Sequence, residues 1–148
     1  MNKMTLPNAV LLGEATFLLN EGRHVIIPTK GNSMLPFIIG EKDCVKLIKK
    51  KEIQVGDIVL VHLNDGRYVL HRIWSIDADN VTLMGDGNIR GRESCKTQDI
   101  CGTVCEIIKG KGKTVDVSSR PFIWKSSIWR ILLPFRRIIL AIYKRVFI

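Results

Sequence analysis

Short apolar runs separated by turn-forming residues fill the middle of this 148-residue chain. Their β-branched content and lengths predict six strands: Val25–Pro28, Cys44–Ile48, Ile58–Leu63, Tyr68–Ile76, Val81–Met84 and Ile100–Ile108. Asn64-Asp65-Gly66 and Asp77–Asn80 each lie between two such runs and favour hairpin turns. The pattern therefore predicts a mostly β fold, antiparallel and partly closed.

The chain begins with a helical pattern. Pro7 and Asn8 are typical of a helix start, and the pattern ends near Asn20–Gly22. Four apolar residues are available on this short helix for the core: Val10, Leu11, Phe17 and Leu18. The apolar stretch Ala9–Leu19 is broken by Gly13 and Glu14 and lacks a small-x-small cleavage motif, so we expect neither a secretory signal nor a spanning helix here.

The pattern changes again after Val117. At 100° per residue from Ile128, one side of a helix gathers Ile131, Leu132, Phe135, Ile138, Ile139, Ile142 and Val146, and the other gathers Arg130, Arg136, Arg137, Lys144 and Arg145. Pro134 is expected to kink this helix. We therefore divide the chain into a domain at residues 1–119 and a basic amphipathic C-terminal helix at residues 120–148.

Charge indicates what that helix contacts. The chain has 23 Lys and Arg against 14 Asp and Glu, a formal net charge of +9, which favours anionic partners. Uncharged runs in residues 120–148 reach only Ile138–Tyr143, well short of the roughly 18 residues needed to span a bilayer. We expect the helix to lie on an anionic membrane surface. The alternative is packing on its own domain or on a partner subunit. Nucleic acid is not expected, because the apolar stripe would stay exposed.

The candidate nucleophile is Ser33, in the stretch Lys-Gly-Asn-Ser-Met-Leu-Pro-Phe. Gly31 frees the backbone before the serine and Pro36 fixes φ after it, so a tight and rigid loop displays the hydroxyl. A serine hydroxyl is almost fully protonated near neutral pH and needs a positioned base.

Three histidines could supply that base: His24, His62 and His71. His24 precedes the first strand, and His62 lies in a strand where a partly buried structural role is typical. His71 lies in Tyr-Val-Leu-His-Arg-Ile-Trp, and its neighbours alone also fit a structural histidine. The order of motifs along the chain is what favours His71.

Four short motifs follow one another: Gly-x-Ser-Met-x-Pro around Ser33, then Gly56-Asp57-Ile-Val-Leu-Val, His71-Arg72-Ile73 and Met84-Gly85-Asp86-Gly87-Asn88. In this order, from Val25 to Val104, the chain resembles the type I signal peptidases and the self-cleaving SOS-type repressors. The resemblance implies one mostly β peptidase fold, with Ser33 as nucleophile. It places His71 where many relatives have a lysine base, and histidine needs less tuning because its pKa starts at about 6.5.

A third residue could orient His71. Asp86 is the first candidate, because a carboxylate on the far imidazole nitrogen fixes the tautomer and stabilises the imidazolium. The alternative for Asp86 is that it caps a turn between Gly85 and Gly87. Asp99, just before the strand at Ile100–Ile108, is the second candidate.

The resemblance also suggests how substrate is held. Backbone N–H groups from Gly31 to Ser33 are expected to stabilise the oxyanion, because Gly31 stands where some relatives have a side-chain hydroxyl. Met34 and Pro36 are the candidate substrate-pocket residues. A peptide or protein substrate is expected to bind extended against a strand edge, with small side chains near the scissile bond.

No cofactor is expected for this chemistry. The four cysteines, Cys44, Cys95, Cys101 and Cys105, form no Cys-x-x-Cys pair and match no common zinc spacing, so we predict no structural metal. Without an export signal, reduced thiols are the simpler expectation.

These features lead to one expected function and one alternative. We expect a serine endopeptidase that cleaves a signal, leader or precursor peptide at a membrane face, located in the cytoplasm and peripherally membrane-associated. The alternative is a non-catalytic, membrane-associated binding module that retains the peptidase fold. Self-cleavage as in the repressors is disfavoured, because no separate helix-turn-helix domain or linker cleavage site is recognised before the core.

Overall fold

The computed structural model describes residues 8–147. Its helices are α1 (Asn8–Asn20), α2 (Arg120–Ile131) and α3 (Arg136–Phe147), with 3-10 turns at Thr97–Asp99 and Leu133–Phe135. Its strands are β1 (Val25–Pro28), β2 (Cys44–Ile48), β3 (Ile58–His62), β4 (Tyr68–Asp77), β5 (Asn80–Met84), β6 (Glu93–Lys96), β7 (Ile100–Ile108) and β8 (Thr114–Asp116).

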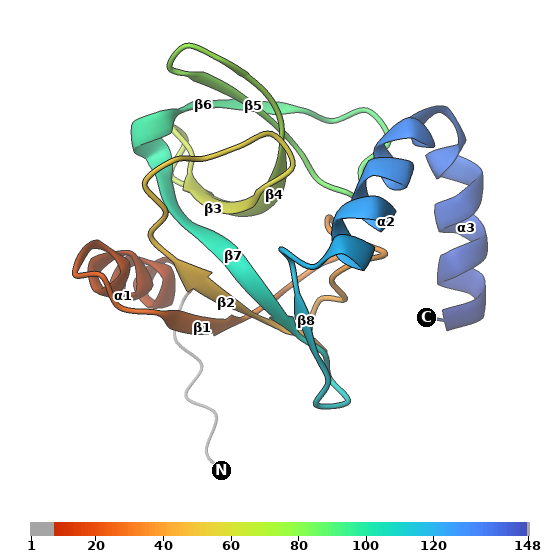
Figure 1. Ribbon diagram of the computed structural model, residues 1–148, viewed down its shortest axis with the longest axis horizontal. Coiled ribbons are helices and arrows are strands. Elements are labelled where there is room, and N and C mark those ends of the chain that lie inside the picture. The colour runs from red at the N-terminus through yellow and green to blue at the C-terminus, as the bar shows by residue number, and fades with distance from the viewer. Residues whose placement is uncertain (1–7, 148) are drawn as a thin grey trace.

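The eight strands form one antiparallel sheet. Its order is β1-β2-β7-β3-β4-β5-β6, with β8 paired to β7. Register shifts in the β2–β7, β3–β7 and β4–β5 pairs mark β-bulges, which bend strands and increase their twist. In Figure 1 the sheet curls strongly, with α1 beside β1 and the pair α2 and α3 on the opposite side. The predicted mostly β, antiparallel fold is confirmed.

The predicted strands are confirmed to within one or two residues. The expected turns join β3 to β4 and β4 to β5, where Asp77 pairs directly with Asn80. Two strands, β6 and β8, were not predicted. Both are short and largely polar, so neither has the apolar alternation on which a strand prediction depends.

The core has one cluster between α1 and the strands β1, β2 and β7, and another among β3 to β6. Helix α1 contributes Ala15 and Leu19 to the first cluster, and a Cβ on Gly102 of β7 would lie 2.8 Å from Leu19 Cδ1. Val10 and Phe17 are exposed instead of contributing to the core as expected. The helix meets the sheet along a narrow line, so only the residues on that line are covered.

The C-terminal segment forms two helices instead of one kinked helix. The 3-10 turn Leu133–Phe135, which contains Pro134, separates α2 from α3. Trp129 of α2 and Leu140 of α3 pack with Leu35 in a third apolar cluster. Arg136, expected on the solvent face, is only 2% exposed because the chain reverses at Pro134 and turns this residue toward the core.

Candidate active site

Ser33 lies in the loop between β1 and β2, residues 29–43, which we call the Ser33 loop. Asp43 fixes this loop: its carboxylate accepts the Ile39 amide at 2.8 Å, the Gly110 amide at 2.9 Å and Lys109 Nζ at 2.6 Å. Although burial opposes ionisation, these donors together hold the pKa of Asp43 below its usual range. The ion pair ties the loop to the hairpin that joins β7 and β8.

A second loop, residues 85–88, holds the Ser33 loop from the other side, and we call it the Gly85 loop. The Gly87 amide donates to the Ser33 carbonyl oxygen at 2.8 Å. A Cβ on Gly85 would lie 2.3 Å from that oxygen, and one on Gly87 would lie 2.1 Å from the Asn32 carbonyl oxygen. The two backbones touch directly, so only glycine fits at either position.

His71 and Ser33 line the same cavity, which has a volume of about 200 Å³. His71 comes from β4 and is only 6% exposed, whereas Ser33 is partly exposed. A Cβ built on Gly85 would lie 3.2 Å from His71 Cδ2 and 2.3 Å from the Ser33 carbonyl oxygen, so the imidazole and the Ser33 backbone both approach Gly85. The fold therefore brings together two residues that are 38 positions apart in the sequence.

Glu93, at the start of β6, approaches the far side of the imidazole. Its Oε1 lies 2.8 Å from His71 Nδ1, and its Oε2 lies 3.3 Å from Arg67 Nη2. The short Nδ1–Oε1 distance fits a charge-assisted hydrogen bond, although Nδ1 has no hydrogen bond of standard geometry within the described part of the chain. The contact is thus a close approach of the carboxylate to the imidazole.

Sequence reasoning missed Glu93. It comes 22 residues after His71, on a four-residue strand that was not predicted. Without β6, nothing in the sequence places this glutamate beside β4. The alternation within Glu-Ser-Cys-Lys, which buries Cys95 alone, was the available signal.

Burial lowers the pKa of His71 below its usual value of 6.5. The negative charges of Glu93 and Asp86 oppose that shift, and the positive charge of Arg67 adds to it. The imidazole is therefore neutral at pH 7, the form that accepts a proton. No hydrogen bond joins its Nε2 to any residue that the structure describes.

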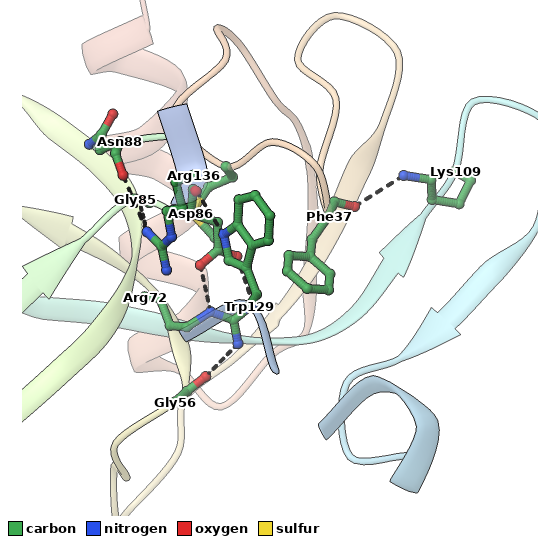
Figure 2. Close-up of polar contacts among 10 residues, drawn as sticks. Phe37, Gly56, Arg72, Gly85, Asp86, Asn88, Lys109, Trp129 and Arg136 are labelled. Atoms are coloured by element: carbon green, nitrogen blue, oxygen red, sulfur yellow. Dashed lines mark hydrogen bonds and ion pairs between the residues drawn. The ribbon is translucent and has the colours of Figure 1, made fainter. Parts of the chain in front are cut away.

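Asp86, the expected orienting acid, bonds to Arg72 instead. Its two oxygens accept Arg72 Nε at 2.8 Å and Nη2 at 2.7 Å. Successive side chains of a strand point to opposite faces, so Arg72 and its carboxylate lie on the face away from His71. Figure 2 shows Arg72 between Asp86 and the Gly56 carbonyl, which accepts Arg72 Nη1 at 2.9 Å.

Asp99, the second expected candidate, also makes another contact. Its carboxylate accepts the Lys96 amide at 2.9 Å at the 3-10 turn Thr97–Asp99. A carboxylate that caps its own turn is a common local arrangement. Of the three acids considered, Glu93 is the one whose carboxylate contacts the imidazole.

The expected oxyanion donors are only partly free. Gly31 has a φ of +75°, and its amide donates to Glu41 Oε1 at 3.2 Å. The Ser33 amide has no acceptor among residues 8–147. An amide on the nucleophile itself is well placed to meet charge that develops on an attacked carbonyl. The structure thus favours Ser33 over Gly31 as the donor.

The cavity beside Ser33 is small and largely apolar. Its walls come from α1, β1, the Ser33 loop, β3 and β4: Leu11, Leu12, Ile27, Pro28, Thr29, Lys30, Gly31, Met34, Ile38, Leu60, Tyr68, Val69 and Leu70. Met34 lines it as expected, and Pro36 does not. Its volume lies below the roughly 300–1,000 Å³ of drug-sized ligand sites, which suits a site for one or two side chains.

A larger cavity of about 550 Å³ lies on the other face of β4. It is lined by Arg72, Asp86 and Arg136, among others, but by neither Ser33 nor His71. Size therefore does not identify the candidate active site here. The smaller cavity is the one that both Ser33 and His71 line.

The C-terminal helices contact the Gly85 loop from behind. Trp129 Nε1 donates to the Asp86 carbonyl at 2.8 Å, and Arg136 Nη1 donates to the Asn88 carbonyl at 3.2 Å. In Figure 2 both side chains point at this loop. Since the loop in turn holds Ser33, residues of α2 and α3 help to fix the position of Ser33.

Among residues 8–147, no three His, Cys, Asp or Glu side chains gather to hold a metal ion. All four cysteines are free thiols. Burial raises the pKa of Cys95 to about 11, so its reactive thiolate is scarce near neutral pH.

Comparison with known proteins agrees with this fold. A model of the Peptidase S24-like family matches residues 3–105, more than half of the chain and all of the segment that carries Ser33, His71 and Glu93. No curated protein matches the chain significantly. The predicted resemblance is confirmed at the level of the family, and this chain belongs to the Peptidase S24-like family.

Proposed function

We propose that this protein is a serine endopeptidase in which Ser33 is the nucleophile, His71 the general base and Glu93 the group that orients His71. The observation that carries the proposal is that Ser33 and His71 line one cavity while Glu93 approaches the opposite side of the imidazole. Membership of a peptidase family supports the reaction class.

In the first step, Ser33 Oγ attacks the substrate carbonyl carbon and His71 Nε2 accepts the hydroxyl proton. Glu93 stabilises the imidazolium that forms, and Arg67 Nη2 pairs with the other oxygen of the Glu93 carboxylate at 3.3 Å. The Ser33 amide donates to the oxyanion, an interaction worth about 3–4 kcal/mol in related chemistry. His71 then protonates the leaving amine, and a water molecule hydrolyses the acyl-enzyme by the same path.

The substrate binds as an extended peptide. Strand β1 ends the sheet and leads directly into the Ser33 loop, so its open edge offers backbone groups to an added strand. Ile27 and Pro28, at the end of β1, and Thr29, the first residue of the Ser33 loop, line the cavity. This arrangement suits a signal, leader or precursor peptide with a small apolar side chain near the scissile bond.

A serine-directed fluorophosphonate probe tests the proposal on the full chain. We expect covalent labelling at Ser33, none in Ser33→Ala, and a loss of at least about 10³-fold in rate in His71→Ala, because the hydroxyl then lacks its base. His62→Ala is the matched control, since His62 is exposed in β3. Equal labelling of wild type and His71→Ala would refute the proposal. No labelling of a folded wild type would favour a non-catalytic binding module.

A further inference from the structure

The solvent face of the C-terminal helices carries a row of large apolar side chains. We call this row the outer stripe: Ile131, Phe135, Ile138, Ile142 and Val146, each between 58% and 77% exposed. Single exposed apolar residues are ordinary, but a contiguous row marks an interaction surface. The stripe runs from the end of α2 along the whole of α3.

The stripe cannot turn inward, because the opposite side of α3 is already packed. Leu140 is 3% exposed and lies in a cluster with Leu35 and Trp129. Ile139 and Tyr143 pack against the same cluster. The helix thus has two apolar sides, and the protein itself covers only one of them.

The charge around the stripe is of one sign. No Asp or Glu follows Asp116 in the sequence, whereas seven Lys and Arg do: Arg120, Lys125, Arg130, Arg136, Arg137, Lys144 and Arg145. On α3, Arg137, Lys144 and Arg145 are exposed beside the stripe. An occupant of this surface must satisfy an apolar row and exposed cations together.

We propose that the outer stripe docks on an anionic lipid bilayer, with α3 lying in the plane of the interface. Acyl chains cover the apolar row, and anionic headgroups pair with the cations beside it. No helix among residues 8–147 is long and apolar enough to cross a bilayer. This inference stands on the surface alone and does not require the protein to be a peptidase.

A second copy of the chain fits the surface less well. Joining two stripes would bring exposed cations together with no carboxylate on either helix to match them. A bilayer supplies negative charge in excess over its whole area. The charge complementarity therefore selects lipid over self-association.

Vesicle flotation of the full chain tests the apolar part of the proposal. We expect binding to phosphatidylcholine vesicles that contain phosphatidylglycerol, and much weaker binding to phosphatidylcholine alone. Ile138→Asp combined with Ile142→Asp should lower the partition coefficient by at least about tenfold, because two apolar side chains that would enter the bilayer are lost. Val10→Asp combined with Phe17→Asp, a pair of exposed apolar residues on α1, is the matched control.

A second variant tests the contribution of the exposed cations to vesicle binding. Replacing Arg137, Lys144 and Arg145 by Gln should weaken binding roughly a hundredfold, at about fivefold for each cation near the surface. Lys42, Lys111 and Lys113, all exposed, give a control with the same change in net charge when replaced by Gln. Thermal melts of each variant show that the fold is kept.

Three results would overturn the proposal: no binding to either vesicle, equal loss in control and test variants, or a solution dimer that Ile138→Asp with Ile142→Asp dissociates. Analytical ultracentrifugation measures the last. Ser33→Ala should bind vesicles as the wild type does. A failure of docking is thereby separated from a failure of the proposed peptidase activity.

Discussion

Two carboxylates contact side chains on opposite faces of β4, and the two contacts differ in whether the partner side chain keeps a free nitrogen. On one face Asp86 accepts two hydrogen bonds from Arg72, and both partners are nearly buried. On the other face Glu93 contacts His71 at Nδ1, while Nε2 has no hydrogen-bond partner among residues 8–147 and His71 lines the same cavity as Ser33. We call Asp86–Arg72 the saturated pair, because both carboxylate oxygens accept hydrogen bonds, and such a pair fixes structure. We call Glu93–His71 the open pair, because the imidazole keeps one nitrogen that is free among the described residues and can accept a proton.

This comparison explains why Asp86, the acid that the motif order suggested, does not contact His71, whereas Glu93 does. His71 and Arg72 are neighbours on a strand, so their side chains point to opposite faces. Asp86 follows Arg72 to its face. The residue that meets His71 comes from β6, two strands away in the sheet.

The largest expected effect is on the saturated pair. Asp86→Asn should lower the free energy of unfolding by about 3–5 kcal/mol, because Arg72 is left buried without its counter-charge. Urea titration of Asp86→Asn and of Asp65→Asn, an exposed control, measures the difference. At pH 8 the rate of Ser33 labelling per folded molecule should stay within a few-fold of wild type. A full loss of labelling in folded Asp86→Asn would assign Asp86 a role that the contacts do not support.

The next effect concerns the open pair. Glu93→Gln should slow Ser33 labelling roughly a hundredfold, because the imidazolium loses its counter-charge. The loss should be smaller than the about 10⁴-fold seen when a fully buried triad carboxylate is neutralised, since the Glu93 side chain is 21% exposed. Glu106→Gln, which alters a half-buried pair with Lys46, is the control. An unchanged rate in Glu93→Gln would remove Glu93 from the mechanism.

A smaller effect is expected where the two loops touch. Gly87→Ala should cost about 2 kcal/mol in stability, because its methyl group would meet the Asn32 carbonyl oxygen at 2.1 Å. Labelling should slow as well, since the displaced backbone carries Ser33. Gly91→Ala has open space around it and should change neither quantity. Chemical denaturation and probe kinetics on both variants decide the point.

The smallest expected effect is the dependence of the labelling rate on pH. The labelling rate should rise with pH as His71 loses its proton, with a midpoint below 6.5 because burial lowers the pKa of His71. In Glu93→Gln the midpoint should move further down, because the negative charge that raises this pKa is gone. A midpoint above 6.5 in the wild type would contradict the burial argument.

Stability should follow the same titration. The unfolded chain binds a proton at His71 more readily than the folded chain does, so stability rises with pH across this range. The contribution of neutral His71 is complete above pH 6.5 and is lost as the pH falls toward the lower folded-state pKa. Thermal melts of wild type and His71→Gln between pH 4 and pH 8 should diverge from each other only at the acidic end.

Much of the fold could be predicted from the sequence because its longer strands are apolar. β2 and β7 have the predicted bounds, and each buries at least two side chains that show in the pattern. β6 could not be predicted, because it buries only Cys95. Glu93 was missed for that reason alone: its role depends on strand pairing, which local sequence does not record.

The prediction for the C-terminal segment was wrong for a different reason. Helical periodicity grouped Ile138, Ile139 and Ile142 on one apolar side, but it assumed one continuous axis from Ile128; in the structure Ile138 and Ile142 are exposed, while Ile139 packs against the inner cluster. The reversal at Pro134 rotated Arg136 inward, where its donors meet backbone carbonyls. A single-helix projection cannot represent a chain that changes direction, so the buried arginine was assigned to solvent.

The inward packing of Trp129 and Leu140 makes the tail unsuitable for deletion. Cutting the chain after residue 119 would remove the cover from Leu35 and a donor to the Asp86 carbonyl, so the Ser33 loop would lose its support together with any lipid contact. If a truncated protein neither floated with vesicles nor reacted with a probe, a single loss of structure would explain both results. The truncation would therefore not show that membrane binding and labelling are separate functions. Only substitutions of outward-facing residues can test membrane binding without also disturbing the candidate active site.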